Sequence, residues 1–168
     1  MDVPLPNSPP GSLLDESDHD DELWFSDGTL GLSAGRSSFR VYGGLLAKRS
    51  LVFHDMLQFP QPDDADVVDG CPMVHLQDNE ADPRSFLNAL FDYQFFPPFP
   101  EKTTFDILAG VIRLSTKYQV ESLRKRALGH PLSSFPFTVD EYPGTPSLKI
   151  PDHEWIRVVN FAREMSID

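Results

Sequence analysis

The sequence predicts an α+β domain in which a small, mostly three-stranded sheet packs with a cluster of helices. Apolar residues first alternate at Phe39 and Val41, which is typical of a half-buried strand. The apolar spacing then becomes helical, from Leu46 through Phe53 to Leu57. Farther along the chain, apolar residues again recur at helical spacing, so helices are expected to outnumber strands there.

The first two strands are expected shortly after an acidic N-terminal segment. Asp27-Gly28 is a turn signal between apolar residues, and a strand is predicted at about 29–33. A second strand is predicted at 39–42. Gly43 and Gly44 follow it, and their flexible backbone is expected to let the chain turn into the next element.

Helical segments are predicted over 45–57, and Pro60 and Pro62 should stop them because proline does not fit a helix interior. An acidic loop at 63–69 then leads into a short strand at 73–76.

Further helices are predicted from their start and stop signals. Asp82-Pro83 is a strong start, with Asp82 as N-cap and Pro83 at the first helical position. Thr103 or Thr104 is expected to cap the next helix, and Gly129 to end the one after it.

These patterns divide the chain into four parts. Residues 1–21 combine prolines and acids with little to bury, which predicts a disordered acidic tail, and the folded domain is expected at 22–130. A proline-rich linker is predicted at 131–151, followed by an apolar helix at 152–168. An apolar helix must pack on something, so it could begin a further helical region.

The charge distribution bears on the class of partner. The formal net charge is −12, and residues 1–35 contain eight acidic residues and no Lys or Arg. An acidic chain is a poor match for a phosphate backbone, so no nucleic-acid partner is expected. The one basic cluster is interpreted as the solvated face of helices and comprises Arg113, Lys117, Arg124, Lys125 and Arg126.

Composition also predicts the compartment. Apolar runs are too short to span a membrane, so no membrane partner is expected. The absence of basic residues before Arg36 argues against a secretory signal or a mitochondrial presequence. A lone cysteine, Cys71, excludes an intramolecular disulfide and suits a reducing compartment, so a cytoplasmic or nuclear location is expected.

No catalytic, cofactor-binding or metal-binding residue is predicted. Cys71 and His75 would lie roughly 13 Å apart on a strand, beyond hydrogen-bonding reach. The acidic stretch around His19 partly matches a calcium loop, but Asp21 replaces its turn glycine, so a disordered tail is favoured. The protein is therefore expected not to be an enzyme, although an enzyme or metal-binding protein with an unrecognised site remains an alternative.

Four separated blocks of the chain, at about 23–129, resemble a BTB/POZ domain. The first block contains Asp27 and Leu30, and the others are Phe39, Leu46, Ala47, Ser50, Phe53 and Met56; Val74, Leu76, Asp78, Phe86, Leu87 and Leu90; and Leu108, Leu114, Lys117, Tyr118, Val120 and Leu123. The stretches 24–28 and 68–72 are similar to BTB proteins of mushroom-forming fungi. Tyr42 and Gly43 depart from the His and basic residue that most members carry, so the corepressor-linked charged pocket of transcription-factor members is not expected.

The resemblance implies a protein-interaction module that self-associates, as a homodimer, and acts as a scaffold or adaptor without a cofactor. By analogy, the contact residues are Leu45, Arg49, Phe53, His54, Met56, Leu57 and Phe59. An alternative within the same class is a substrate adaptor of a cullin-type ubiquitin ligase. The resemblance places the cullin surface at 53–61, with 152–168 extending it.

Overall fold

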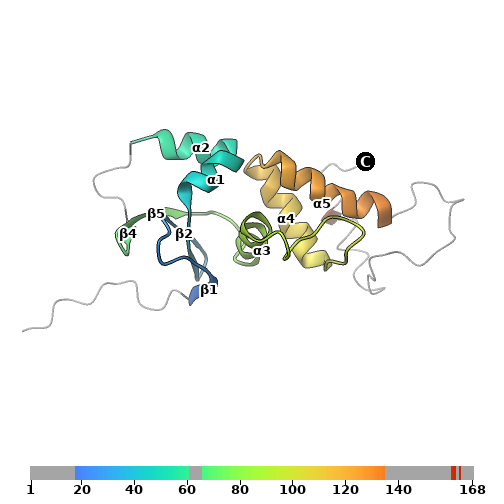
Figure 1. Ribbon diagram of the computed structural model, residues 1–168, viewed down its shortest axis with the longest axis horizontal. Helices are drawn as coiled ribbons and strands as arrows, with labels where there is room; N and C mark the ends of the chain where they lie inside the picture. Colours follow the sequence, from blue (N-terminus) through green and yellow to red (C-terminus); the bar gives the residue numbers. More distant parts are fainter. Residues whose placement is uncertain (1–17, 61–65, 135–159, 162, 164–168) are drawn as a thin grey trace, which may run out of the picture.

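The computed structural model describes residues 18–60, 66–134, 160, 161 and 163 (Figure 1). These residues form a five-stranded mixed sheet and five helices, which confirms the α+β class but gives more strands than the expected three. The strands are β1 (Asp18–Trp24), β2 (Leu30–Ala34), β3 (Ser37–Val41), β4 (Val67–Val68) and β5 (Cys71–His75). The helices are α1 (Gly43–Arg49), α2 (Leu51–Gln58), α3 (Ala81–Phe91), α4 (Phe105–Lys117) and α5 (Glu121–Ser134).

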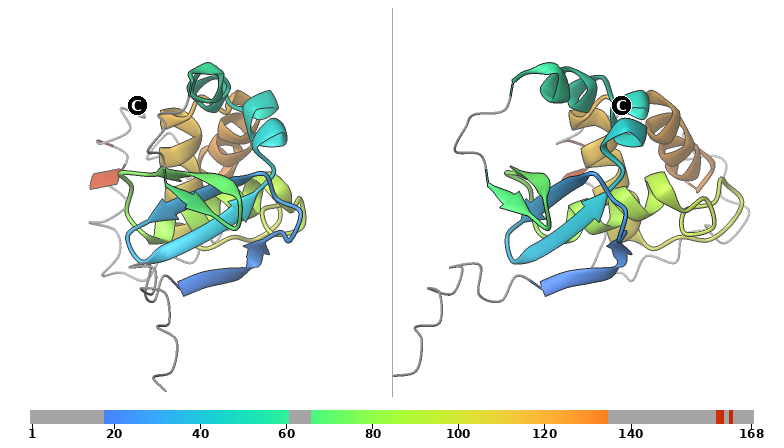
Figure 2. Two further views of the ribbon diagram at one scale, coloured as in Figure 1. Left: turned by 90° about the vertical axis from the view of Figure 1, so that its left-hand side faces the viewer. Right: turned by 60° about the vertical axis from the view of Figure 1, so that its left-hand side comes forward.

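The sheet has the strand order β1-β3-β2-β5-β4 (Figure 2). β2 and β3 form an antiparallel hairpin whose register runs from Leu30 opposite Val41 to Ala34 opposite Ser37. Gly35 turns the hairpin at a φ of 58°, a left-handed conformation that glycine adopts without strain. β1 joins β3 in parallel, β5 joins β2 in parallel, and β4 pairs antiparallel with β5.

Strand β1 corrects the expected start of the folded domain, because the predicted disordered tail at 1–21 overlaps it by four residues. Leu23 is buried in the core, which anchors the strand. The carboxylate of Asp20 is also buried and pairs with the Arg84 guanidinium of α3 at 2.7 Å. This pairing offsets the cost of burying an acid, a long-range contact that the local sequence does not reveal. The rest of the predicted tail, at 1–17, lies outside the described residues.

Gly43 does not act as the expected flexible turn, because it is the first residue of α1 and its backbone is not left-handed. It is buried, and its N–H donates to the Thr29 hydroxyl at 3.1 Å. A Cβ at this position would lie 3.2 Å from the Cβ of Leu30. The glycine therefore permits close packing of α1 against the start of β2.

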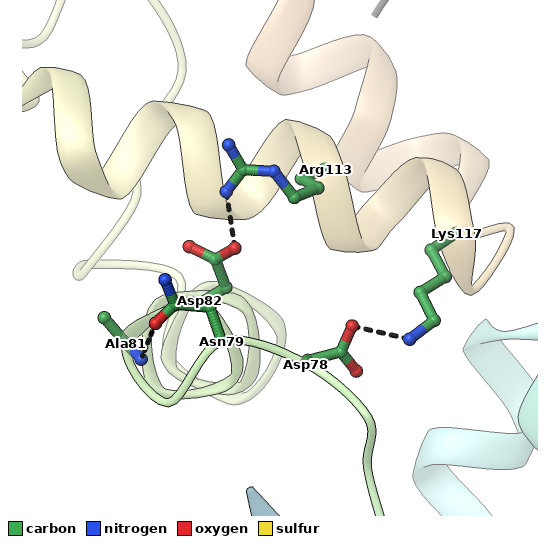
Figure 3. Close-up of polar contacts among 6 residues, drawn as sticks. All are labelled: Asp78, Asn79, Ala81, Asp82, Arg113 and Lys117. Carbon is green, nitrogen blue, oxygen red and sulfur yellow. Dashed lines mark hydrogen bonds and ion pairs between the residues drawn. The ribbon is translucent and has the colours of Figure 1, made fainter. Parts of the chain in front are cut away.

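The start of α3 also differs from the prediction. The helix begins at Ala81, so Asp82 lies in its first turn and is not the N-cap. The side chain of Asn79 accepts from the Ala81 N–H at 3.2 Å, while the Asp82 carboxylate reaches across to Arg113 of α4 at 2.5 Å (Figure 3). The expected cap of the next helix is confirmed, since the Thr104 hydroxyl accepts from the Ile107 N–H.

The last helices pack as expected on their inner face but end differently. Val120, Leu123 and Ala127 are buried. Gly129 does not end the helix, because α5 continues to Ser134 and so replaces the first residues of the predicted linker at 131–151. The remainder of that linker and residues 63–65 of the acidic loop predicted at 63–69 lie outside the described residues. The described part of that loop contains β4, so the loop prediction is wrong there.

A short C-terminal piece returns to the domain. Within the predicted helix at 152–168, residues 160, 161 and 163 are described, and they are helical. The Phe161 ring is buried, meets the Phe105 ring edge-on at 5.9 Å, and lies 5.5 Å from the Arg113 guanidinium carbon. This part of the chain therefore packs on α4.

Figure 1 shows α3 lying between the sheet and the α4–α5 hairpin, with α1 and α2 together on one side. Four phenylalanines are fully buried where these layers meet: Phe39, Phe53, Phe86 and Phe96. Among the described residues, the helices are either too short or too polar to cross a membrane.

Candidate functional site

The α1–α2 helix pair carries six of the seven residues expected to make contacts, and the seventh, Phe59, follows α2 directly. Ser50 is the N-cap of α2, and its hydroxyl accepts from the Phe53 N–H at 3.1 Å, which stabilises the start of the helix. The Phe53 ring is fully buried and stacks on Tyr118 with 4.6 Å between ring centroids. The inner face of α2 is thereby fixed to the end of α4, and the opposite face is left at the surface.

The structure separates the expected contact residues into two groups. Phe53 is wrongly placed among them, because a fully buried ring offers no surface to a partner. The half-buried side chains are Leu45, Met56 and Leu57, and of these Met56 and Leu57 pack against the core. The exposed side chains are Arg49, His54 and Phe59.

The outer face of α2 includes one residue that the sequence analysis missed. Leu51 is 64% exposed, and Phe59, just after the helix, is 70% exposed. Leu51 precedes Phe53 by two residues, which corresponds to about 200° around a helix, so it faces away from the buried ring. The signal in the sequence is an apolar residue on the side of the helix opposite the face of Leu46, Phe53 and Leu57.

Polar groups lie between these two apolar side chains. His54 and Asp55 are exposed neighbours, and the His54 Nδ1 lies 3.1 Å from a carboxylate oxygen of Asp55. Arg49 ends α1, where its positive charge is favourable beside the helix C-terminus. The outer face of α2 is therefore apolar at its two ends and polar between them.

A separate polar chain lies on the sheet. The His75 Nδ1 lies 2.6 Å from the Ser33 hydroxyl, and its Nε2 lies 2.7 Å from the Asp66 carboxylate. An ionised carboxylate can only accept, so the His75 Nε2 donates to Asp66, and the Nδ1 is bonded to the Ser33 hydroxyl. The order hydroxyl, imidazole, carboxylate matches that of serine hydrolases.

Solvent access argues against catalysis by this chain of groups. The side chains of His75 and Asp66 are 55% and 64% exposed. Nucleophilic sites gain most of their rate from fixed dipoles in a water-excluded cleft, and these side chains stand in water. We interpret the three groups as a link that ties the segment before β4 to β5 and β2.

Cys71 is structural, as expected, because its buried thiol donates to the Gly28 carbonyl oxygen at 3.0 Å. Within the described ranges, the side chains of His, Cys, Asp and Glu do not gather into a group that could hold a metal ion.

The basic residues of α4 and α5 are not simply a solvated face. Arg113 pairs with the buried Asp82, and the Lys117 Nζ lies 2.5 Å from the Asp78 carboxylate (Figure 3). The Asp78 carboxylate also accepts from the Tyr118 hydroxyl. These two cations therefore fasten α4 to α3 and to the segment before it.

No family model matches the chain, and no curated protein matches it.

Proposed function

We propose that this chain is a protein-interaction module of the BTB/POZ type, that it self-associates, and that it acts as a scaffold or adaptor rather than as an enzyme. The element order supports the proposal. The β2–β3 hairpin, the α1–α2 pair, β5, α3 and the α4–α5 pair follow one another in the order that the sequence resemblance implies.

The observation that carries the proposal is the exposure of Leu51 and Phe59 at the two ends of α2. Exposing large apolar side chains costs free energy that burial against a second surface recovers, at about 25 cal/mol per Å². Paired with Arg49 and His54, they form a patch that we call the α2 surface: Arg49, Leu51, His54 and Phe59. We infer that two copies of the chain meet through it.

The test is the molar mass of the full chain in solution, measured by light scattering after size exclusion. The wild-type chain should have the mass of a dimer, and Leu51→Glu with Phe59→Glu should have the mass of a monomer. Val67→Glu is the matched control, because Val67 is 58% exposed but lies on β4.

Two results would overturn the proposed self-association. One is a monomeric wild-type chain at concentrations up to about 100 μM, a range in which transient dimers assemble. The other is a dimer that persists in the double variant with unchanged far-ultraviolet circular dichroism.

A cullin-type adaptor is the second candidate, and the packing of Phe161 on α4 favours it. The resemblance assigns part of the cullin grip to helices after the domain, and here a C-terminal helical residue returns to the domain surface. A purified cullin N-terminal domain should bind the full chain and lose affinity at least tenfold with His54→Glu. Equal affinity in the variant, or no binding, would remove this candidate.

The enzyme alternative would depend on Ser33, His75 and Asp66. We expect the chain to hydrolyse p-nitrophenyl acetate no faster than free imidazole does. A Ser33-dependent burst of nitrophenol, lost in Ser33→Ala, would instead establish an acyl-enzyme and contradict the proposal.

A further inference from the structure

A cavity of about 270 Å³ lies where α1, α3 and α5 meet, and it shares one residue, Arg49, with the α2 surface. Two guanidinium groups line it, Arg49 from the end of α1 and Arg126 from α5. The remaining wall combines Tyr93 and Ser122 with the apolar side chains of Leu90 and Leu123. The cavity therefore pairs concentrated positive charge with an apolar wall.

Arg126 is held in place by contacts that leave its charge unmatched. Its Nη2 donates to the Ala89 carbonyl oxygen at 2.7 Å, and its guanidinium carbon lies 5.3 Å from the Tyr93 ring centroid and 5.6 Å from that of Phe96. Its Nε is buried and has no hydrogen-bond partner among the described residues. A guanidinium carries five donors, so much of its hydrogen-bonding capacity is left for a ligand.

The positive charges of Arg49 and Arg126 also repel each other. Neither Arg49 nor Arg126 forms an ion pair with a carboxylate of the described residues. Burial lowers the pKa of the Arg126 guanidinium from its ordinary value, and the charge of Arg49 acts in the same direction, although Tyr93 opposes them. An anion placed between the two groups would relieve this repulsion.

The size and lining of the cavity narrow the class of anion. A volume of about 270 Å³ falls just below the roughly 300 Å³ at which pockets for drug-sized ligands begin. A cavity of this size can accommodate a single side chain of a partner protein. The apolar wall of Leu90 and Leu123 favours an anion with a hydrocarbon stem over a bare, strongly hydrated ion.

We propose that this cavity binds a glutamate or aspartate side chain of an acidic peptide segment on a partner protein, whose carboxylate accepts from Arg49 and Arg126. Two guanidinium groups that donate to one carboxylate form charge-assisted hydrogen bonds and fix the orientation of that carboxylate. The inference rests on the proposed function, since it supplies a binding preference to an interaction module. It does not require self-association.

The test is a titration of the isotopically labelled full chain, followed by nuclear magnetic resonance. Two peptides differ in one group: acetyl-Leu-Glu-Leu-amide and acetyl-Leu-Gln-Leu-amide. The glutamate peptide should shift the side-chain signals of Arg49 and Arg126 and bind at least fivefold more tightly than the glutamine peptide. Arg49→Gln should remove that preference, and Arg126→Lys should weaken it because lysine lacks the planar fork.

Arg36→Gln is the matched control, because it removes the same charge from the exposed β2–β3 turn and should leave binding unchanged. Equal binding of the two peptides, or unchanged binding in Arg49→Gln, would overturn the proposal. Tighter binding of inorganic phosphate than of the glutamate peptide would overturn the assignment to a carboxylate. Repeating the titration on the Leu51→Glu, Phe59→Glu variant separates the two proposals, because glutamate-dependent binding by a monomer supports this one even where self-association fails.

Discussion

The hydroxyl of Ser50 donates a 2.6 Å hydrogen bond to the backbone carbonyl oxygen of Tyr118. The two residues are separated by 68 positions in the sequence, and the bond joins the α1–α2 corner to the α4–α5 turn. Ser50 is 1% exposed, so water cannot replace the bond when it is lost. The same hydroxyl accepts from the Phe53 N–H, and one atom thus serves both a helix cap and a long-range contact.

Ser50→Ala should therefore lower the free energy of unfolding by about 2 to 3 kcal/mol, because it removes an N-cap and leaves a buried carbonyl unsatisfied. Urea denaturation followed by tryptophan fluorescence measures the change. Ser26→Ala, at an exposed turn position, should change stability by less than about 0.5 kcal/mol. A Ser50 variant as stable as this control would show that the bond contributes nothing.

The two faces of α2 should respond in opposite ways to truncation. Phe53→Ala removes a fully buried ring and should destabilise the fold by about 3 to 5 kcal/mol. Leu51→Ala should change the stability of the isolated chain by less than about 0.5 kcal/mol, because Leu51 is largely exposed. Thermal and urea unfolding at micromolar chain concentration test this contrast, and a large loss for Leu51→Ala would mean that its face is covered.

Asp78 binds the last residue of α4, Lys117, and the C-cap residue, Tyr118, since its carboxylate accepts from both side chains. Asp78→Ala should cost about 2 to 3 kcal/mol, because the half-buried Tyr118 hydroxyl loses a charged acceptor. Lys117→Met should cost less than about 1 kcal/mol, since the lysine side chain is 43% exposed and its ion pair is screened by water. Equal losses for the two variants would contradict this division.

His130 should make stability depend on pH. Burial lowers the pKa of its imidazole and the Arg126 charge lowers it further, while its Nε2 bond to the Pro97 carbonyl opposes the change. As pH falls below about 6.5, the unfolded chain takes up a proton that the folded chain resists. Stability should thus be retained above that pH and decline toward pH 5.

His130→Gln retains a donor for Pro97 but cannot titrate, so its stability should fall less steeply than that of the wild-type chain between pH 7 and pH 5. His54→Gln, which replaces an exposed imidazole, should keep the wild-type slope. Urea midpoints at several pH values give these slopes. Parallel curves for wild type and His130→Gln would exclude His130 as the source.

Much of the element order could be predicted from local patterns. The β2–β3 hairpin follows a turn signal and alternating residues, and the Thr104 cap is a local hydrogen bond. β1 could not be predicted, because its one buried acid, Asp20, becomes compatible with a strand through Arg84, more than sixty positions away. Likewise, the local sequence predicts Asp82 as an N-cap, but in the folded chain its carboxylate pairs with Arg113 of another helix.

The candidate site shows a similar limit. Helical spacing located the α1–α2 pair correctly, but the contact residues came from the resemblance, and they included the buried Phe53 and left out the exposed Leu51. The cavity between Arg49 and Arg126 joins residues of three helices, and their proximity depends on tertiary packing. Single-sequence periodicity contains no information on that packing.

Strand β1 lies at the outer edge of the sheet, and its sequence contains Asp18, Asp20, Asp21 and Glu22. The free edge of a sheet exposes backbone groups that can recruit another strand, which is a route to aggregation. A second copy approaching edge to edge would bring like charges into register and be repelled, more strongly at low ionic strength. The acidic strand therefore disfavours polymerisation through this edge of the sheet.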